Sequence, residues 1–342
     1  MTRSETVLQV EDLSCSIDTA DGPVKLVDNV SFAVRRGETL GVVGESGSGK
    51  TMLVRTIMGI NPNAATVTGR VVLDGVDVLT LPKKERRRRL GAGIGMVFQN
   101  PMTSLNPVVP VGRQITEGLR YHRSLGRREA RARALELLEL VGISEPAARL
   151  KQYPYQLSGG MRQRVMIAAA LACDPDVLIA DEATTALDVT VQKQILDLIK
   201  EIQTSRNMSA IIISHDLGVV SGRTDQLAVM YASQVVESGA TAEVFARHRH
   251  QYTSALLRSI PDIEAEIHTK LATIPGSPRR NTPDVVGCRF APRCTAATDK
   301  CREDDPAPEF DDGSTSHWYR CHWPTPLPDG SSGMRLAKAG HE

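Results

Sequence analysis

This sequence of 342 residues has almost no net charge and no long hydrophobic run. Its 41 lysines and arginines balance 40 aspartates and glutamates, for a formal charge of +1 at pH 7. Nothing in this balance calls for a nucleic acid or an anionic membrane as the partner. No apolar stretch approaches the ~20 residues of a membrane span, and residues 1–5 lack the apolar run of a signal peptide. We therefore expect a cytosolic chain that reaches any membrane through partner proteins.

The rest of the chain is organised around a glycine-rich stretch. It fits the phosphate-loop pattern G-x-x-x-x-G-K-[ST] at every fixed position, and its residues are Gly44, Glu45, Ser46, Gly47, Ser48, Gly49, Lys50 and Thr51. An apolar run at 39–43 predicts a buried strand before it, and helical spacing runs from Met52 to residue 60. A strand that turns through glycines into a helix directs backbone N–H groups at a polyanion. In such a loop Lys50 reaches the β- and γ-phosphates, and the Thr51 hydroxyl binds Mg²⁺.

Polar side chains follow three other predicted buried strands. Asp181 and Glu182 come after residues 177–180, Gln99 ends the strand that begins at residue 95, and His215 follows residues 210–214. Parallel sheets place ligand-binding groups at such strand ends. Asp181 is thus predicted to hold Mg²⁺ through its water shell, and Glu182 to act as general base on an attacking water. A histidine alone is more often a core or capping residue, but this position favours a role at the ligand.

The hydrophobic pattern divides the chain into segments. Short strands are predicted within 7–36, and a helical segment at about 100–157 carries an apolar stripe from Ala130 to Val141. Alternating strands and helices then predict parallel βαβ units. Beyond about residue 250 proline and cysteine become frequent and periodicity fades. We predict a domain at 1–250 with a helical subdomain inserted at about 100–157, and a loop-rich extension at 251–342 whose last dozen residues are disordered.

A second predicted anion-binding site, at the start of another helix, points to a protein family. Ser158, Gly159 and Gly160 stand at a predicted helix start, although one phosphate loop needs no second corner. With this segment the sequence resembles the nucleotide-binding subunits of ABC transporters over residues 7 to about 323. The resemblance implies an α/β fold: a P-loop NTPase, ABC nucleotide-binding domain with an inserted helical subdomain and a loop-rich, cysteine-containing C-terminal extension.

The same resemblance implies roles for individual residues. By this resemblance Gln99 corresponds to the glutamine of the Q-loop, and Asp181-Glu182 corresponds to the Walker B pair. Asp188 corresponds to the end of the D-loop, and His215 to the switch histidine. Two such domains pair head-to-tail in that family, so the serine and two glycines of the signature would contact ATP bound to the partner. The implied catalytic residues are Lys50, Glu182 and His215, and the implied Mg²⁺ ligands are Thr51, Gln99 and Asp181. The implied nucleotide contacts are Ile17, Gly44, Glu45, Ser46, Gly47, Ser48, Gly49, Lys50, Thr51, Met52, Gln99, Ser158, Gly159, Gly160 and Asp188.

Three residues depart from the general family pattern. Met161 replaces the usual glutamine of the signature, although methionine is common in the peptide subfamily. Ala183 replaces the proline that usually follows the Walker B glutamate. Ile17 aligns where an aromatic ring normally stacks on adenine, so either an aliphatic surface packs on the base or the alignment of that hairpin is shifted.

Four further stretches look like those of oligopeptide and dipeptide importer ATPases: 98–107, 184–192, 250–257 and 287–294. This resemblance implies ATP hydrolysis that drives the import of peptides or similar small solutes. The implied partners are a second ABC ATPase subunit, usually a paralogue that forms a heterodimer, two transmembrane permease subunits that dock on the helical insertion, and an extracytoplasmic solute-binding protein, with no nucleic acid. The chain would lie at the cytoplasmic face of the membrane.

Alternatives to peptide import stay open. Related importers take nickel, glutathione, siderophores or short saccharides, because the specificity lies in other subunits. A soluble ABC ATPase in translation or DNA repair would usually carry two such domains or a long coiled-coil insertion. An iron–sulfur carrier or assembly scaffold driven by an ATPase would rest only on the cysteines of the extension.

Four of the six cysteines cluster near the C-terminus: Cys288, Cys294, Cys301 and Cys321. In a reducing cytosol such a cluster suggests a metal before a disulfide. The intervening gaps of five, six and nineteen residues contain no C-x₂₋₄-C pair of the kind that structural zinc sites use. The spacing therefore favours a [4Fe–4S] cluster over Zn²⁺, and importer ATPases resembling this one carry such clusters. Zn²⁺, or four reduced cysteines without a ligand, are the alternatives.

Overall fold

The computed structural model describes residues 5–20, 22–183, 188–260, 273–277, 285–311 and 314–326. These residues form two compact units, each drawn from separate segments of the chain. The first unit comprises the chain up to Asp18, Lys25–Leu40 and Thr51–Ser214, and the second comprises Thr19–Val24, Gly41–Lys50 and the chain from His215 on. The tail predicted to be disordered and residues 186 and 187 of the predicted D-loop lie outside the described residues.

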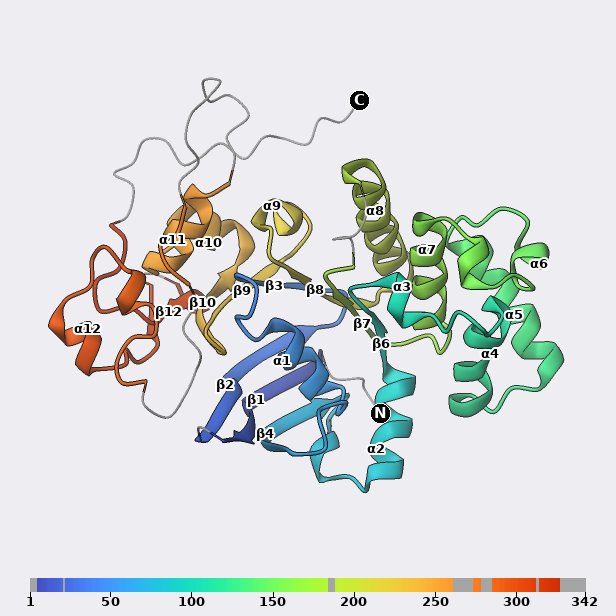
Figure 1. Ribbon diagram of the computed structural model, residues 1–342, viewed down its shortest axis with the longest axis horizontal. Coiled ribbons are helices and arrows are strands. Elements are labelled where there is room, and N and C mark those ends of the chain that lie inside the picture. The colour runs from blue at the N-terminus through green and yellow to red at the C-terminus, as the bar shows by residue number, and fades with distance from the viewer. Residues whose placement is uncertain are drawn as a thin grey trace. The chain divides into compact units, whose positions relative to one another are not determined.

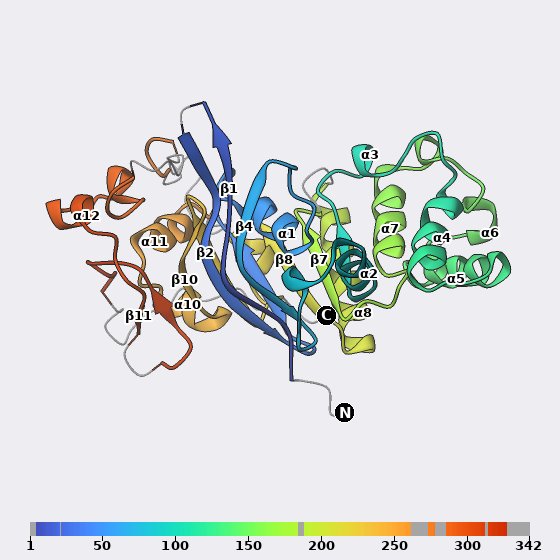
Figure 2. The same ribbon diagram turned by 90° about the horizontal axis from the view of Figure 1, so that it is seen from below.

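An antiparallel sheet in the first unit is built from the strands near the N-terminus. Its strands are β1 (Thr6–Thr19), β2 (Gly22–Arg35), β4 (Ala65–Leu73) and β5 (Val76–Asp77), in the order β2-β1-β4-β5. Figures 1 and 2 show β1, β2 and β4 side by side. The strands are longer than the short ones predicted, because the pairing of β1 with β4 continues past a register shift between Glu11 and Ser14. Asp12, with a φ of +47°, lies at this shift, which accommodates the polar residues that interrupt the apolar pattern.

Three parallel strands carry the predicted strand-end residues of the first unit. They are β6 (Ile94–Val97), β7 (Val177–Asp181) and β8 (Ser209–Ser214). β7 pairs in parallel with β6 on one side and with β8 on the other, and all residues of β7 and β8 are buried. The chain around them contains α1 (Lys50–Ile57), η1 (Val78–Thr80), α2 (Lys83–Gly93) and α8 (Val189–Arg206). The predicted parallel arrangement is confirmed here.

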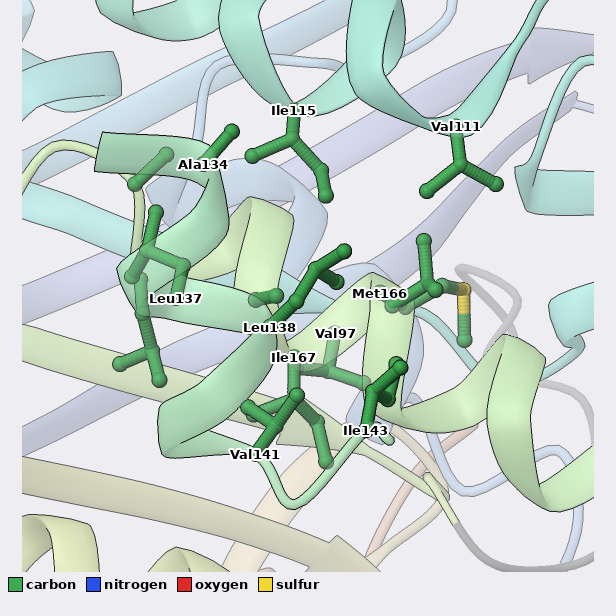
Figure 3. Packing of buried hydrophobic residues seen from close by; sticks show 14 of the residues in the cluster. Val97, Val111, Ile115, Ala134, Leu137, Leu138, Val141, Ile143, Met166 and Ile167 are labelled. Atoms are coloured by element: carbon green, nitrogen blue, oxygen red, sulfur yellow. The ribbon is translucent and has the colours of Figure 1, made fainter. Parts of the chain in front are cut away.

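The predicted helical segment folds as a group of short helices, seen together in Figure 1. They are α3 (Pro101–Ser104), α4 (Val111–His122), α5 (Arg127–Leu140), α6 (Pro146–Arg149), η2 (Pro154–Gln156) and, from the signature onward, α7 (Gly159–Ala170). The apolar stripe predicted for α5 is buried, and Leu137 and Leu138 pack with Ile115 of α4 and Ile167 of α7 in one hydrophobic cluster (Figure 3). Gly142 follows α5 with a φ of +71°, the left-handed conformation that commonly ends a helix.

The second unit contains an antiparallel sheet and the C-terminal segment. The strands β9 (Gln226–Tyr231), β10 (Gln234–Ala240), β11 (Glu309–Phe310) and β12 (Trp318–Tyr319) lie in the order β11-β12-β10-β9. The helices are α9 (Leu217–Val220), α10 (Thr241–Arg247), α11 (Gln251–Arg258), η3 (Ala291–Arg293) and α12 (Asp299–Glu303). Figure 2 shows α10 and α11 near β10. Across both units, no helix in the described part of the chain is long and apolar enough to cross a membrane.

A buried carboxylate ties the C-terminal segment to this sheet. Glu237 on β10 is fully buried, and its carboxylate accepts hydrogen bonds from the backbone N–H groups of Arg249 at 2.6 Å and His250 at 3.0 Å. The Nε2 atom of His317 lies 2.8 Å from the same carboxylate. Because both oxygens have partners, the cost of burying the charge is compensated. The carboxylate thus connects β10, the start of α11 and the chain just before β12.

Candidate active site

The phosphate loop follows β3 (Thr39–Val43), whose residues are all buried. Gly44 has a φ of +153°, and a Cβ at this position would lie 2.1 Å from the carbonyl oxygen of Met230, so only glycine fits. Lys50 is 4% exposed, and its ammonium donates to the carbonyl oxygens of Gly44 at 2.7 Å and Glu45 at 2.9 Å. The loop is therefore closed around the ammonium of Lys50.

Two pairs of predicted site residues meet at the ends of the parallel strands in the first unit. The Thr51 hydroxyl donates to Oδ1 of Asp181 at 3.1 Å, and Asp181 is 2% exposed. The Gln99 amide donates to Oε2 of Glu182 at 2.6 Å. Glu182 has a φ of +44°, and its backbone N–H donates to the carbonyl of Ile213 on β8 at 3.1 Å. Hydroxyl and carboxylate oxygens, the ligands that Mg²⁺ prefers, thus lie next to a second carboxylate.

The signature serine and Asp188 each cap a helix of the first unit. Ser158 Oγ accepts from the backbone N–H of Met161 at 3.3 Å, and Asp188 Oδ1 accepts from that of Val191 at 2.9 Å. A Cβ on Gly160 would lie 3.3 Å from a methyl group of Val191, so the first turns of α7 and α8 are close together. Ser158 is exposed at the start of a helix of 12 residues. Its helix therefore presents free N–H groups of the kind that bind anions.

Three other predicted residues occupy positions open to a ligand. His215 is exposed and directly follows β8, and Met52 is half-buried in the first turn of α1. Ile17 is half-buried on β1, where it pairs with Ala65 of β4. Each side chain keeps part of its surface accessible.

Two residues that the sequence analysis did not single out contact the phosphate loop. The guanidinium of Arg293 binds the carboxylate of Glu45 through hydrogen bonds of 2.6 and 2.9 Å. The hydroxyl of Tyr252 accepts a hydrogen bond of 2.8 Å from the Glu45 backbone N–H. Glu45 occupies a variable position of the motif, so no local pattern connects it with either residue. The only available signal was that both lie in stretches resembling those of peptide importers.

The four clustered cysteines line one small cavity together with Phe290 and Trp323. All four are free thiols. Burial raises the pKa of Cys288 to about 12 and also raises the pKa of Cys294 and Cys321, so these thiols stay protonated at neutral pH without a cation. Backbone N–H groups of Phe290 and Ala291 donate to the sulfur of Cys288. Such hydrogen bonds also tune iron–sulfur clusters.

No group of three or more histidine, cysteine, aspartate or glutamate side chains within the described ranges is arranged to hold a metal ion. The iron–sulfur cluster and the cysteine-containing metal extension predicted from the sequence are therefore not supported by that arrangement. They stay predictions.

The contact between Thr51 and Asp181 distinguishes this loop from an ordinary glycine-rich turn. A hydroxyl at the start of a helix and a carboxylate at the end of a buried strand are what a nucleotide-bound Mg²⁺ requires on the protein side. Together with a lysine enclosed by the loop, they define a P-loop nucleoside-triphosphate-binding protein.

Comparison with known proteins narrows this class. The family model described as "ABC transporter" matches residues 27–185, and that of the "Oligopeptide/dipeptide transporter, C-terminal region" matches residues 236–301. The dipeptide transport ATP-binding protein DppD of Escherichia coli (strain K12) is 45% identical over 320 residues, which cover 93% of this chain and 97% of that protein. The oligopeptide transport ATP-binding protein AppD of Bacillus subtilis (strain 168) is 47% identical over 306 residues, 88% of this chain and 92% of that protein. The chain therefore belongs to the ABC transporter family, among the ATP-binding proteins of oligopeptide and dipeptide transporters.

Solved structures share its fold. The dimeric ATP-binding cassette MJ0796 in a post-hydrolysis state, bound to ADP and Pi, superposes with a TM-score of 0.62 at 26% identity, covering 68% of this chain and 98% of that one. The cbiO1 subunit from Clostridium perfringens, part of the ABC transporter complex cbiONQ, gives a TM-score of 0.60 at 29% identity, covering 71% and 92%.

Proposed function

We propose that this chain hydrolyses ATP to power the import of dipeptides or oligopeptides through separate membrane proteins. One observation carries the proposal: the similarity to named peptide-transport ATP-binding proteins runs through 93% of the chain at 45% identity. It includes the C-terminal region that has its own peptide-transporter family model. A likeness confined to the phosphate loop would support ATP binding but not this cargo.

The roles proposed for the site residues follow from their contacts. The loop amides and Lys50 bind the phosphates, while Thr51, Gln99 and Asp181 organise Mg²⁺, which supplies charge stabilisation at the phosphates when bound. Glu182 accepts the proton of the attacking water. His215 is placed at the terminal phosphate in this proposal, and Ile17 and Met52 near the rest of the nucleotide.

A head-to-tail pair of ATPase subunits is part of the proposal. The helix that starts after Ser158 presents N–H groups suited to an anion, while the chain's own phosphate loop already provides one phosphate site. The likeness to a dimeric cassette bound to ADP and Pi supports this arrangement. We assign the second position to a paralogue, which would make the ATPase pair a heterodimer.

Two membrane permeases and an extracytoplasmic solute-binding protein complete the assembly. The helical segment offers two exposed apolar side chains to a permease: Met102 is 62% exposed and Val108 is 77% exposed. We expect the permease to cover these two side chains. This contact would hold the chain at the cytoplasmic face of the membrane.

Peptide uptake tests the proposed cargo. Cells without this chain should lose uptake of a labelled dipeptide, and the wild-type chain should restore it. Lys50→Ala should not restore it, because the ammonium enclosed by the loop is lost. Lys84→Ala, at an exposed position of α2, is the matched control and should restore uptake fully. Normal dipeptide uptake combined with lost uptake of nickel, glutathione, a siderophore or an oligosaccharide would replace the peptide by that cargo.

A [4Fe–4S] cluster held by Cys288, Cys294, Cys301 and Cys321 is the second part of the proposal. The proposal rests on the spacing of the four cysteines, which all line one small cavity, and on the N–H donors at Cys288 and Cys321. A zinc ion needs all its ligands at ~2.3 Å from one point, whereas a cluster binds each thiolate through a different iron and so accepts sulfurs that lie farther apart. A structural role follows, because the cluster would crosslink a segment with little regular structure.

Anaerobic purification should yield a brown chain with about four irons and broad absorbance near ~400 nm, on the chemistry of four-cysteine clusters. Cys294→Ser should lower the iron content and the melting temperature. Cys173→Ser, a buried cysteine on another part of the chain, should keep the iron. A colourless anaerobic preparation with stoichiometric zinc would decide for Zn²⁺, and one with neither metal would leave only reduced cysteines.

A further inference from the structure

The guanidinium of Arg293 is built into a buried site whose centre is the side chain of Glu45. The Arg293 side chain is 5% exposed and that of Glu45 is 25% exposed. Besides its two bonds to the carboxylate, the guanidinium donates to the carbonyl oxygens of Pro275 at 2.7 Å and Ile274 at 3.3 Å, and to the Tyr231 hydroxyl at 3.3 Å. Its three nitrogens therefore all have acceptors. The nearby carboxylate raises the pKa of Arg293 further, so the cation is permanent.

Three aromatic rings pack together next to this site. The centroids of Tyr231 and Tyr252 are 4.6 Å apart, and the ring of Phe290 lies 5.3 Å from the first and 5.4 Å from the second. The whole chain has only 6 tyrosines and 5 phenylalanines, so this grouping uses a scarce residue class. Tyr252 is fully buried, and its hydroxyl accepts the hydrogen bond from the Glu45 N–H.

Glu45 in turn contacts the lysine of the phosphate loop. Its carbonyl oxygen accepts from the Lys50 ammonium at 2.9 Å. The residue is therefore held at three points: the carboxylate by Arg293, the N–H by Tyr252 and the carbonyl by Lys50. Glu45 alone connects Arg293 with Lys50, so a substitution of Arg293 should alter the surroundings of the lysine.

We propose that Arg293 is a positioning residue for ATP binding, through which the C-terminal segment sets the conformation and the charge of the phosphate loop. It holds Glu45 in place and neutralises a carboxylate that would otherwise repel the nucleotide phosphates. The segment that carries Arg293 and Phe290 is bracketed by Cys288 and Cys294, so the fold of the cysteine region determines where the guanidinium lies. The inference rests on the proposed function only in that the loop binds ATP.

Nucleotide affinity of the full-length chain tests the proposal. Arg293→Gln should raise the Kd for Mg-ATP by about 10-fold, the scale of one lost charge-assisted hydrogen bond. Arg293→Lys should lie in between, because an ammonium keeps the charge but not the two-pronged geometry. Arg302→Gln is the matched control, since that arginine lies in the same segment with a side chain 61% exposed; its Kd should equal that of the wild type.

A double variant separates positioning from general loss of structure. Removing the carboxylate as well, in Glu45→Gln/Arg293→Gln, should recover most of the affinity lost in Arg293→Gln, because the uncompensated charge is gone. In the assembled transporter, Arg293→Gln should raise KM for ATP more than it lowers kcat, since the effect is on ground-state binding. Iron content and melting temperature are measured for each variant.

The outcomes are distinct. Wild-type protein that fails to bind ATP would refute the proposed function itself. A wild type that binds ATP together with an Arg293→Gln variant of equal affinity would overturn the positioning role. A double variant no better than Arg293→Gln would overturn the charge argument. If Arg293→Gln does not fold, Arg293→Lys decides in its place: unchanged affinity and KM would contradict the proposal.

Discussion

Glu182→Gln should lower ATP hydrolysis by on the order of 10²–10⁴, the usual contribution of a general base, while ATP still binds. The carboxylate stands directly after Asp181 at the end of a buried strand and accepts a hydrogen bond from Gln99 at 2.6 Å. A glutamine side chain keeps an acceptor oxygen for this bond and preserves the side-chain size, so the loss should reflect the missing base alone.

Phosphate release by the assembled transporter, measured beside Mg-ATP affinity, checks this result. Glu201→Gln, at an exposed position on α8, is a matched control that should hydrolyse ATP normally. Turnover by Glu182→Gln within a few-fold of the wild type would remove Glu182 from the role of base and leave water activation to another group.

Ser158→Arg should abolish hydrolysis at the ATP site that the opposing subunit provides, while this chain's own affinity for ATP is unchanged. The serine is exposed and caps α7. Arginine removes the cap, which costs about 0.5–2 kcal/mol, and places a bulky cation over the N–H groups that would meet the phosphate. Only the second effect is large enough to eliminate an activity.

Assembly of this variant with a wild-type partner permits the measurement of each site separately, by photolabelling with an ATP analogue and by turnover. Ser205→Arg, at an exposed position late in α8, controls for the added arginine and should be active. A second observation must agree: the isolated chain at high dilution should hydrolyse ATP slowly. Full turnover by the dilute monomer would contradict a site shared between two subunits.

The sequence predicted correctly the helices and strands that are determined by the hydrophobic pattern of neighbouring residues. The stripe from Ala130 to Val141 has helical spacing, and its residues are buried on α5. The runs at 177–180 and 210–213 are apolar throughout because both faces of β7 and β8 are covered. Where polar residues interrupt the pattern, as at Asp12, the prediction of short strands was wrong, since a bulge lets the strand continue.

Long-range contacts were beyond prediction. Arg293 and Glu45 are 248 positions apart, and neither position has a periodicity or a motif that specifies the other. The rings of Tyr231, Tyr252 and Phe290 likewise come from separate stretches of the chain that no pattern connects. The cysteine gaps indicated a common site, but only the fold shows that the four thiols share one cavity. Patterns record local geometry and burial, whereas pairing across the chain depends on the assembled tertiary structure.

The enclosure of Lys50 has a consequence for the thermodynamics of nucleotide capture. Lys50 is 4% exposed, and its ammonium already donates to two backbone carbonyls in place of water. Removing the hydration shell of a cation costs several kcal/mol. Because Lys50 is already buried in the folded chain, this cost lowers the free energy of unfolding and does not reduce the affinity for the nucleotide. An incoming phosphate replaces carbonyl oxygens, not a hydration shell, so little reorganisation of the cation opposes binding. The loop is in this sense a preorganised electrostatic environment, because its lysine is largely dehydrated before the nucleotide binds.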